Sequence, residues 1–102
     1  MFSNMSATLL VRTRVVHAED AFADVVLWRV STSLAGSAHH FKYRLAYVVE
    51  GVCVLRFDNE AGKGDHWHSG SRERSYRFTT PEQLLADFGS AITRWNHENR
   101  DT

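Results

Sequence analysis

The sequence lacks the features that mark secreted, membrane-spanning and low-complexity proteins. Cys53 is the single cysteine, so no internal disulfide can form, which is typical of a reducing compartment. No apolar run approaches the roughly 20 residues that a membrane-spanning helix needs. The first residues show no charged segment followed by an apolar core, so we expect no signal peptide and a cytoplasmic location. One proline and six glycines argue against low complexity.

An excess of charge of one sign is also missing. The 12 basic and 12 acidic residues give a formal net charge of zero, so bulk charge does not indicate a nucleic-acid binder. Any such role therefore needs a local basic patch. A hydrophobic fraction of 43% and an aromatic fraction of 12% are enough to build a core. The length of 102 residues predicts one domain that spans residues 1–102.

Most of the chain alternates between apolar and polar residues, which is the pattern of β-strands. A glycine-punctuated stretch, Ala61–Gly70, interrupts this pattern and is predicted to be a loop. The sequence thus predicts an antiparallel sheet of about five strands over residues 7–78. The expected strands are residues 7–17, 21–31, 39–49, 52–59 and 72–78.

The turn at Glu50-Gly51 allows two registers for the central hairpin. A two-residue turn pairs Val49 with Val52, whereas a three-residue loop that ends in a left-handed glycine pairs Val48 with Val52. We favour the second register because it gathers the apolar residues, Cys53 among them, on one buried face. The opposite face then carries Lys42, Arg44, Arg56 and Asp58.

Residues 81–96 are predicted to form a C-terminal helix. Thr80 suits the N-cap, Pro81 suits the first helical position, and Gln83 completes a capping box. We expect an α+β fold in which this helix packs on one face of the sheet and leaves the other face open. The apolar stripe that would contact the sheet consists of Leu84, Leu85, Phe88, Ala91, Ile92 and Trp95.

His66 and His68 are the leading candidates for chemistry, because side chains two residues apart point to the same side of an extended segment. Three interpretations remain open. The pair can act as general acid and base on a phosphodiester, with Asp65 or Asp58 orienting one ring. It can bind a metal ion together with a carboxylate. It can also be an ordinary surface pair beside a packed Trp67.

Basic residues on one predicted strand face suit phosphate binding, because guanidinium groups bind phosphate through paired hydrogen bonds. Lys63 lies between Gly62 and Gly64 in a segment that does not have the spacing of a P-loop, and it can also contact phosphate. Trp67 can stack on an unpaired base. The alternative is a solvated face that acidic residues neutralise. The predicted patch consists of Lys42, Arg44 and Arg56.

Several segments, taken in order, resemble the TumE family of bacterial toxins. They are His40-Phe41-Lys42-Tyr43-Arg44-Leu45, Val49-Glu50-Gly51-Val52, Arg56-Phe57-Asp58-Asn59, Gly62-Lys63-Gly64-Asp65-His66-Trp67-His68 and the stretch from Phe78 to Phe88. The resemblance implies the toxin of a type II toxin–antitoxin module, often carried on mobile elements. It also implies an antitoxin partner with a helix-turn-helix DNA-binding domain, and a homodimer is conceivable within the complex. Two positions depart from the pattern, since we expect tyrosine at Phe57 and a basic residue at Trp67.

From the resemblance and the residues together we expect an endoribonuclease that needs no metal or other cofactor. Non-catalytic inhibition by binding and metal-dependent catalysis by the Asp-His-x-His segment stay open as alternatives. The expected catalytic residues are His66, His68, Lys63 and Asp65. The expected substrate-binding residues are Lys42, Arg44, Arg56, Asp58 and Trp67.

Overall fold

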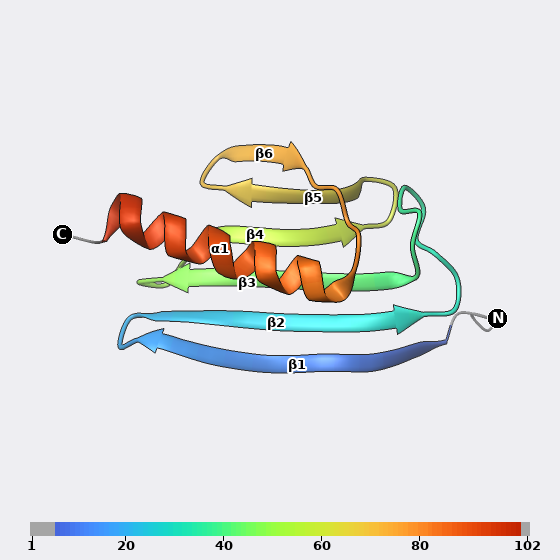
Figure 1. The fold of residues 1–102 in the computed structure, drawn as a ribbon, viewed down its shortest axis with the longest axis horizontal. Coiled ribbons are helices and arrows are strands. Elements are labelled where there is room, and N and C mark those ends of the chain that lie inside the picture. The colour runs from blue at the N-terminus through green and yellow to red at the C-terminus, as the bar shows by residue number, and fades with distance from the viewer. Residues whose placement is uncertain (1–5, 101–102) are drawn as a thin grey trace.

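The computed structural model describes residues 6–100 and confirms the α+β class, with one C-terminal helix packed on an antiparallel sheet (Figure 1). The sheet has six strands where about five were expected, and each strand pairs with its neighbour in the sequence. No helix within these residues is long and apolar enough to span a membrane. The elements are β1 (Ala7–Ala18), β2 (Ala21–Val30), β3 (Phe41–Val49), β4 (Val52–Glu60), β5 (Gly64–Ser69), β6 (Arg72–Ser75) and α1 (Pro81–Asn99).

The additional strand, β5, occupies most of the segment that the sequence predicted to be a loop. Only residues 61–63 form the turn after β4, and Gly64, whose φ is 75°, already begins β5. Glycine indicates a loop in isolation, but here it supplies the left-handed conformation that a tight connection between strands requires. The following strand is shorter than expected, because β6 ends at Ser75 rather than at residue 78.

The hairpin between β3 and β4 has the register that we did not favour. Val49 pairs with Val52 across a two-residue turn, in which Glu50 and Gly51 have φ values of 51° and 78°. A register shift follows, because Tyr47 pairs with Leu55 and Val48 pairs with Cys53. Because of this bulge, Leu55 and the residues after it face the sides of the sheet that we predicted, whereas Cys53 faces the side opposite to the predicted one. Cys53 is exposed, so the prediction that its thiol is buried is wrong.

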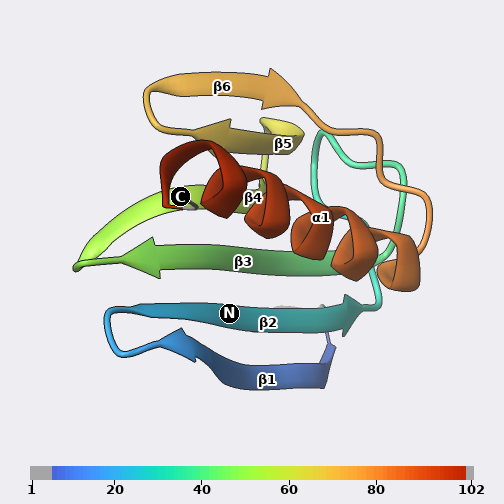
Figure 2. The ribbon, with the colours of Figure 1, turned by 60° about the vertical axis from the view of Figure 1, so that its left-hand side comes forward.

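Helix α1 crosses the sheet over β3 and β4 and buries the core beneath it (Figure 1, Figure 2). The predicted N-cap is confirmed, since Thr80 Oγ1 accepts a hydrogen bond from Gln83 N at 3.1 Å, but the Gln83 side chain donates to Asp87 Oδ1 at 2.8 Å instead of completing the capping box. The helix ends at Asn99, three residues beyond the predicted end, and Leu85 of the predicted stripe is exposed. The helical residues that are fully buried are Leu84, Phe88 and Ile92.

The face of the sheet away from α1 carries most of the polar residues that the sequence singled out. Paired residues of antiparallel strands lie side by side on one face, so the register defines rows of neighbours across the sheet. One row runs Arg12, Val26, Arg44, Asp58, His66 and Ser75. The next row runs Arg14, Asp24, Ala46, Arg56, His68 and Glu73.

Candidate functional site

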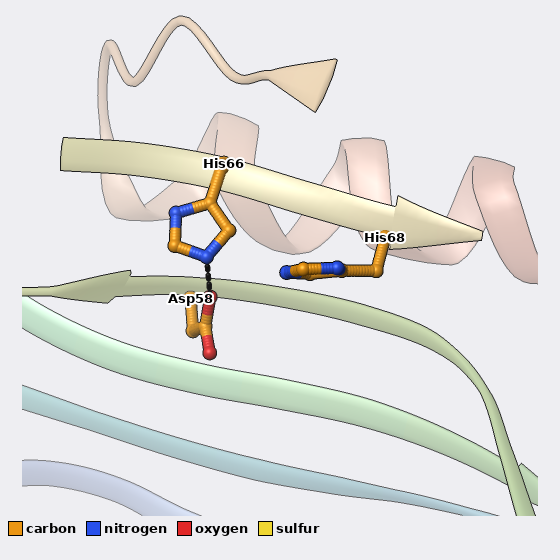
Figure 3. A group of neighbouring side chains, drawn as sticks. All are labelled: Asp58, His66 and His68. Carbon is orange, nitrogen blue, oxygen red and sulfur yellow. Dashed lines mark ion pairs between the residues drawn. The ribbon is translucent and has the colours of Figure 1, made fainter. Parts of the chain in front are cut away.

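The two rows bring Asp58 of β4 together with His66 and His68 of β5 (Figure 3). His66 Nε2 lies 2.7 Å from Asp58 Oδ1. The two imidazole rings meet edge to face, with centroids 4.9 Å apart. Asp58 and His66 are each only 5% exposed although they lie on the face opposite the helix, whereas the side chain of His68 is 24% exposed. The cluster therefore has a buried pair and one accessible ring.

The hydrogen bonds of His66 define its orientation. Its Nδ1 lies 2.9 Å from the carbonyl oxygen of Gly64, which can only accept, so Nδ1 carries a proton. In a neutral ring Nε2 then holds the lone pair, yet Nε2 faces a carboxylate oxygen of Asp58 at 2.7 Å. Two lone pairs repel at that distance. The arrangement is therefore stable only when a second proton or another cation accompanies Nε2.

His68 has two partners at the same nitrogen that require opposite protonation states. Arg56 Nη2 lies 3.0 Å from His68 Nε2, and a guanidinium group can only donate. Glu73 Oε2 lies 3.2 Å from the same atom, and a carboxylate can only accept. The neutral ring is thus matched by Arg56 and the protonated ring by Glu73. A histidine placed in this way has a partner both before and after it takes up a proton.

Asp58 is close to Arg56 and His66 but is poorly hydrogen bonded. Arg56 Nε lies 3.1 Å from Oδ2, and His66 Nε2 lies 2.7 Å from Oδ1. Both contacts are within ion-pair distance, yet Arg56 Nε and Asp58 Oδ1 are buried without an aligned hydrogen bond. The distances therefore indicate charge attraction without directed bonding. Such atoms are rare, because most buried polar groups are paired.

The same cluster contains the residues that could hold a metal ion. The ligand atoms of Asp58, His66 and His68 all lie within 4.8 Å of one another. Two imidazoles and a carboxylate are a ligand set that zinc sites use. The carboxylate that faces the histidines is Asp58 of the neighbouring strand, whereas the metal hypothesis from the sequence used Asp65.

The basic residues expected to bind phosphate lie on the same face. Within residues 6–100, Lys42 and Arg44 are exposed and form neither an ion pair nor a hydrogen bond through their side chains. Arg14, by contrast, is held by Asp24 at 2.7 Å. That hydrogen bond, with a smaller contribution from the charge of Arg44, lowers the pKa of Asp24 below its ordinary value. Two cations on this face are thus free for an anionic ligand.

Asp65 lies on the helix-facing side of the sheet, because side chains alternate along β5. It accepts hydrogen bonds from Ser37 Oγ at 2.9 Å, from Tyr43 Oη at 2.6 Å and from His39 Nε2 at 2.7 Å. His39 Nδ1 accepts a hydrogen bond from the backbone of Phe41, so His39 is a neutral ring with the proton on Nε2. Burial, together with the bond to Asp65, raises the pKa of Tyr43 far above its usual value. Asp65 therefore anchors the segment before β3.

Lys63 and Trp67 take different places from those of the histidine pair. Lys63 lies in the turn before β5 and lines a shallow pocket of about 340 Å³ together with His66 and Glu73. Trp67 points to the helix side and stacks on Phe57, with ring centroids 5.5 Å apart. The structure thus separates Trp67 and Asp65 from the open face and places Lys63 at its edge. The residues gathered on the open face are Lys42, Arg44, Arg56, Asp58, His66 and His68.

Sequence reasoning did not select Glu73, which contacts both histidines. Its Oε2 lies 3.2 Å from His68 Nε2 and 3.6 Å from His66 Nε2. It occupies β6 directly opposite His68. A hairpin with a two-residue turn at Gly70-Ser71 would have predicted that pairing, but the preceding strand was interpreted as a loop, so no partner was assigned.

Comparison with known proteins adds one match. The model of the family described as "Toxin TumE" matches residues 3–96, which is nearly the whole chain. No curated protein and no solved structure matches the chain significantly. The family match agrees with the resemblance carried by the strand and loop motifs, whereas the chemistry must be argued from the site.

Proposed function

The chain belongs to the TumE family of toxins, and from this premise we propose that it cuts RNA on the open face of its sheet. A toxin of this kind has an antitoxin partner. The open face supplies the surface for the RNA backbone, and the histidine pair supplies the reaction centre. The observation that carries the proposal is that His68 Nε2 lies between a hydrogen-bond donor, Arg56, and a carboxylate at ion-pair distance, Glu73.

Binding of the RNA backbone rests on Lys42 and Arg44, whose side chains form no ion pair or hydrogen bond within residues 6–100. Lys42 and Arg44 are exposed beside the cluster, and Arg44 lies directly opposite Asp58 in the register. Phosphate groups would bind these side chains and release counterions, so affinity should fall steeply with salt. Arg56 is only partly exposed, and on leaving His68 it can donate to a phosphate oxygen.

The proposed reaction is transfer of the phosphodiester to the neighbouring 2′-oxygen. Neutral His68 takes the proton of the 2′-hydroxyl, and the oxygen attacks the adjacent phosphorus. The bond from phosphorus to the 5′-oxygen breaks, and His66 turns its Nε2 away from Asp58 and gives the proton on it to that leaving oxygen. The products are a 2′,3′-cyclic phosphate and a 5′-hydroxyl end. Arg56 and Lys63 would stabilise the negative charge that develops on the phosphoryl oxygens.

In this reaction Asp58 acts as a positioning residue. Its carboxylate, 2.7 Å from His66 Nε2, is within ion-pair distance of the doubly protonated ring that a general acid requires. The Gly64 carbonyl holds the other ring nitrogen. Asp58 would therefore act through His66 and would not touch the substrate. Asp65 cannot serve this purpose from the helix side, where its oxygens accept other hydrogen bonds.

The test is incubation of purified, antitoxin-free protein with total RNA at low protein-to-RNA ratio, with and without a chelator, followed by mapping of the new ends. We expect discrete ends that carry 5′-hydroxyl groups in both buffers. His68→Gln should lower the rate at least a hundredfold, since general acid–base groups typically contribute 10²–10⁴-fold. The matched control is His40→Gln, because His40 is an exposed histidine outside the cluster. Intact RNA from protein that still arrests growth would instead indicate inhibition by binding alone.

For the antitoxin we propose docking on the free edge of β1 by a protein with a helix-turn-helix domain. This edge strand is 12 residues long, and 11 of them are exposed. Val15 and Val16 expose 47% and 72% of their surface. A long, apolar, unpaired edge invites an added strand from a partner. The charged face would then be left to the RNA.

A further inference from the structure

We propose that Asp58, His66 and His68 bind one divalent transition-metal ion of the zinc class, with Glu73 completing the ligand set. The inference deepens the proposed function. Binding itself is argued from the cluster alone, and only its effect on RNA cleavage rests on that function. Asp58, His66 and His68 come from the adjacent strands β4 and β5 (Figure 3), and Glu73 comes from β6, so the sheet register holds all four in place.

The tautomer of His66 is the one that a metal ligand needs. Ligand histidines nearly always donate their second ring N–H to a carbonyl or carboxylate, which orients the ring. His66 does so through Nδ1, which lies 2.9 Å from the Gly64 carbonyl oxygen. The lone pair is therefore left on Nε2, which faces Asp58. A metal ion there would replace the second proton that this contact otherwise needs.

The distances between the ligand atoms agree with a tetrahedral site. Bonds of about 2.0–2.1 Å to zinc imply ligand-to-ligand edges of roughly 3.3 Å. The observed edges are 2.7 Å between His66 Nε2 and Asp58 Oδ1, and 3.2 Å and 3.6 Å from the two Nε2 atoms to Glu73 Oε2. These values lie on either side of the expected edge. The ligand atoms of Asp58, His66 and His68 lie within 4.8 Å of one another, so these side chains must draw closer together to surround one centre.

Asp58 supplies an independent reason to expect a cation. Its Oδ1 is buried and has no aligned hydrogen bond, although His66 Nε2 is only 2.7 Å away. Ligands around a common ion point toward the ion and not toward each other, so close but misaligned contacts are what such a site produces. A buried acceptor without a partner destabilises the fold, and more so when it is charged. A bound cation would remove that cost.

Arg56 is a cation that would compete with the metal ion for Asp58 and His68. Its Nη2 contacts His68 Nε2 at 3.0 Å and its Nε lies 3.1 Å from Asp58 Oδ2. Its side chain is 31% exposed, so the guanidinium group has an open path to solvent. An incoming metal ion would displace it. Removal of the Arg56 charge should therefore strengthen metal binding, whereas removal of a ligand should weaken it.

The ligand chemistry selects the class of ion and the effect on the reaction. Imidazole suits zinc and related transition metals, whereas carboxylate and water suit Mg²⁺. With metal on both Nε2 atoms, His68 cannot accept the proton of a 2′-hydroxyl group. The metal-bound protein should therefore not cut RNA, and occupancy of the cluster would control the toxin.

The test uses full-length, antitoxin-free protein without a histidine tag. Titration calorimetry with Zn²⁺ and the visible absorption of added Co²⁺ report binding without reference to activity. We expect one ion per chain and no response to Mg²⁺. His68→Gln should weaken Zn²⁺ binding at least tenfold, Arg56→Gln should strengthen it, and His40→Gln should leave it unchanged.

The outcomes for the two proposals are separable. Saturable one-to-one binding that His68→Gln weakens supports the metal site, and loss of RNA cleavage on addition of Zn²⁺ supports its regulatory effect. A failure of the unaltered chain to bind Zn²⁺, or equal binding by His68→Gln, overturns the metal site and leaves the ribonuclease proposal standing. Binding that turns cleavage on, rather than off, keeps the site but overturns the metal-free reaction.

Discussion

Replacement of Asp65 by alanine should cost stability rather than chemistry. Its carboxylate accepts hydrogen bonds from Ser37, His39 and Tyr43 on the helix side of the sheet. Ser37 and His39 belong to the segment between β2 and β3, so Asp65 is the point that ties this segment to β5. The Asp65→Ala change leaves the buried Tyr43 hydroxyl group without its acceptor.

The magnitude follows from the number and type of bonds lost. A hydrogen bond to a charged group contributes about 1.5–3 kcal/mol, and a buried donor left without its acceptor costs about 1–3 kcal/mol. We therefore expect Asp65→Ala to lower the free energy of unfolding by about 3–5 kcal/mol. Small domains have only about 5–15 kcal/mol in all, so the variant should remain folded only under mild conditions.

Urea denaturation, followed by tryptophan fluorescence, measures the change. The matched control is Asp24→Ala, which removes a carboxylate from the solvent-accessible pair with Arg14 and should cost no more than about 1 kcal/mol. A double-mutant cycle of Asp65→Ala with Tyr43→Phe should give a coupling of about 1.5–3 kcal/mol. Folded Asp65→Ala should retain RNA cleavage.

A loss of stability below about 1 kcal/mol for Asp65→Ala, or no coupling with Tyr43, would refute the anchoring role. Normal stability combined with lost cleavage would return Asp65 to the catalytic role that the sequence suggested. The two roles are thus distinguished by separate measurements on one variant.

Three other outcomes are expected. In urea denaturation, Gly64→Ala should destabilise the fold by at least about 1 kcal/mol more than Gly70→Ala. Both glycines have positive φ, but only a Cβ at Gly64 would meet Gly36 O, at 2.8 Å. Equal losses of stability in the two variants would argue against the clash. The raised pKa of Tyr43 predicts full stability below pH 10.0 and a decline above it, because only the unfolded chain then ionises. Above that pH the free energy of unfolding should fall by about 1.4 kcal/mol per pH unit. Tyr43→Phe should remove this contribution to the pH dependence, which urea denaturation at a series of pH values would measure. Val16→Glu on β1 should weaken antitoxin binding at least tenfold in calorimetry while RNA cleavage persists, and unchanged binding would exclude this edge.

The local features of the fold were predictable from neighbouring residues alone. The helix start depends on Thr80 and on Gln83, which lies within one turn of it. The common facing of His66 and His68 depends only on the two-residue period of an extended chain. The gathering of basic residues on one sheet face likewise followed from alternation along single strands. The α+β class and the single C-terminal helix were therefore accessible from the sequence.

The pairing between strands was decided only by the tertiary structure. Nothing near His66 in the sequence distinguishes Asp58 from Asp65 as its partner. Asp65 is adjacent to His66 in the sequence but lies on the opposite face of the sheet. The choice depends on the register between β4 and β5, and the bulge that exposes Cys53 likewise depends on the pairing of β3 with β4. Glu73 reaches the histidines through a third strand. Alternation along one strand sets which side a residue faces, but hydrogen bonding to another strand sets its neighbour, because that neighbour is distant in the sequence.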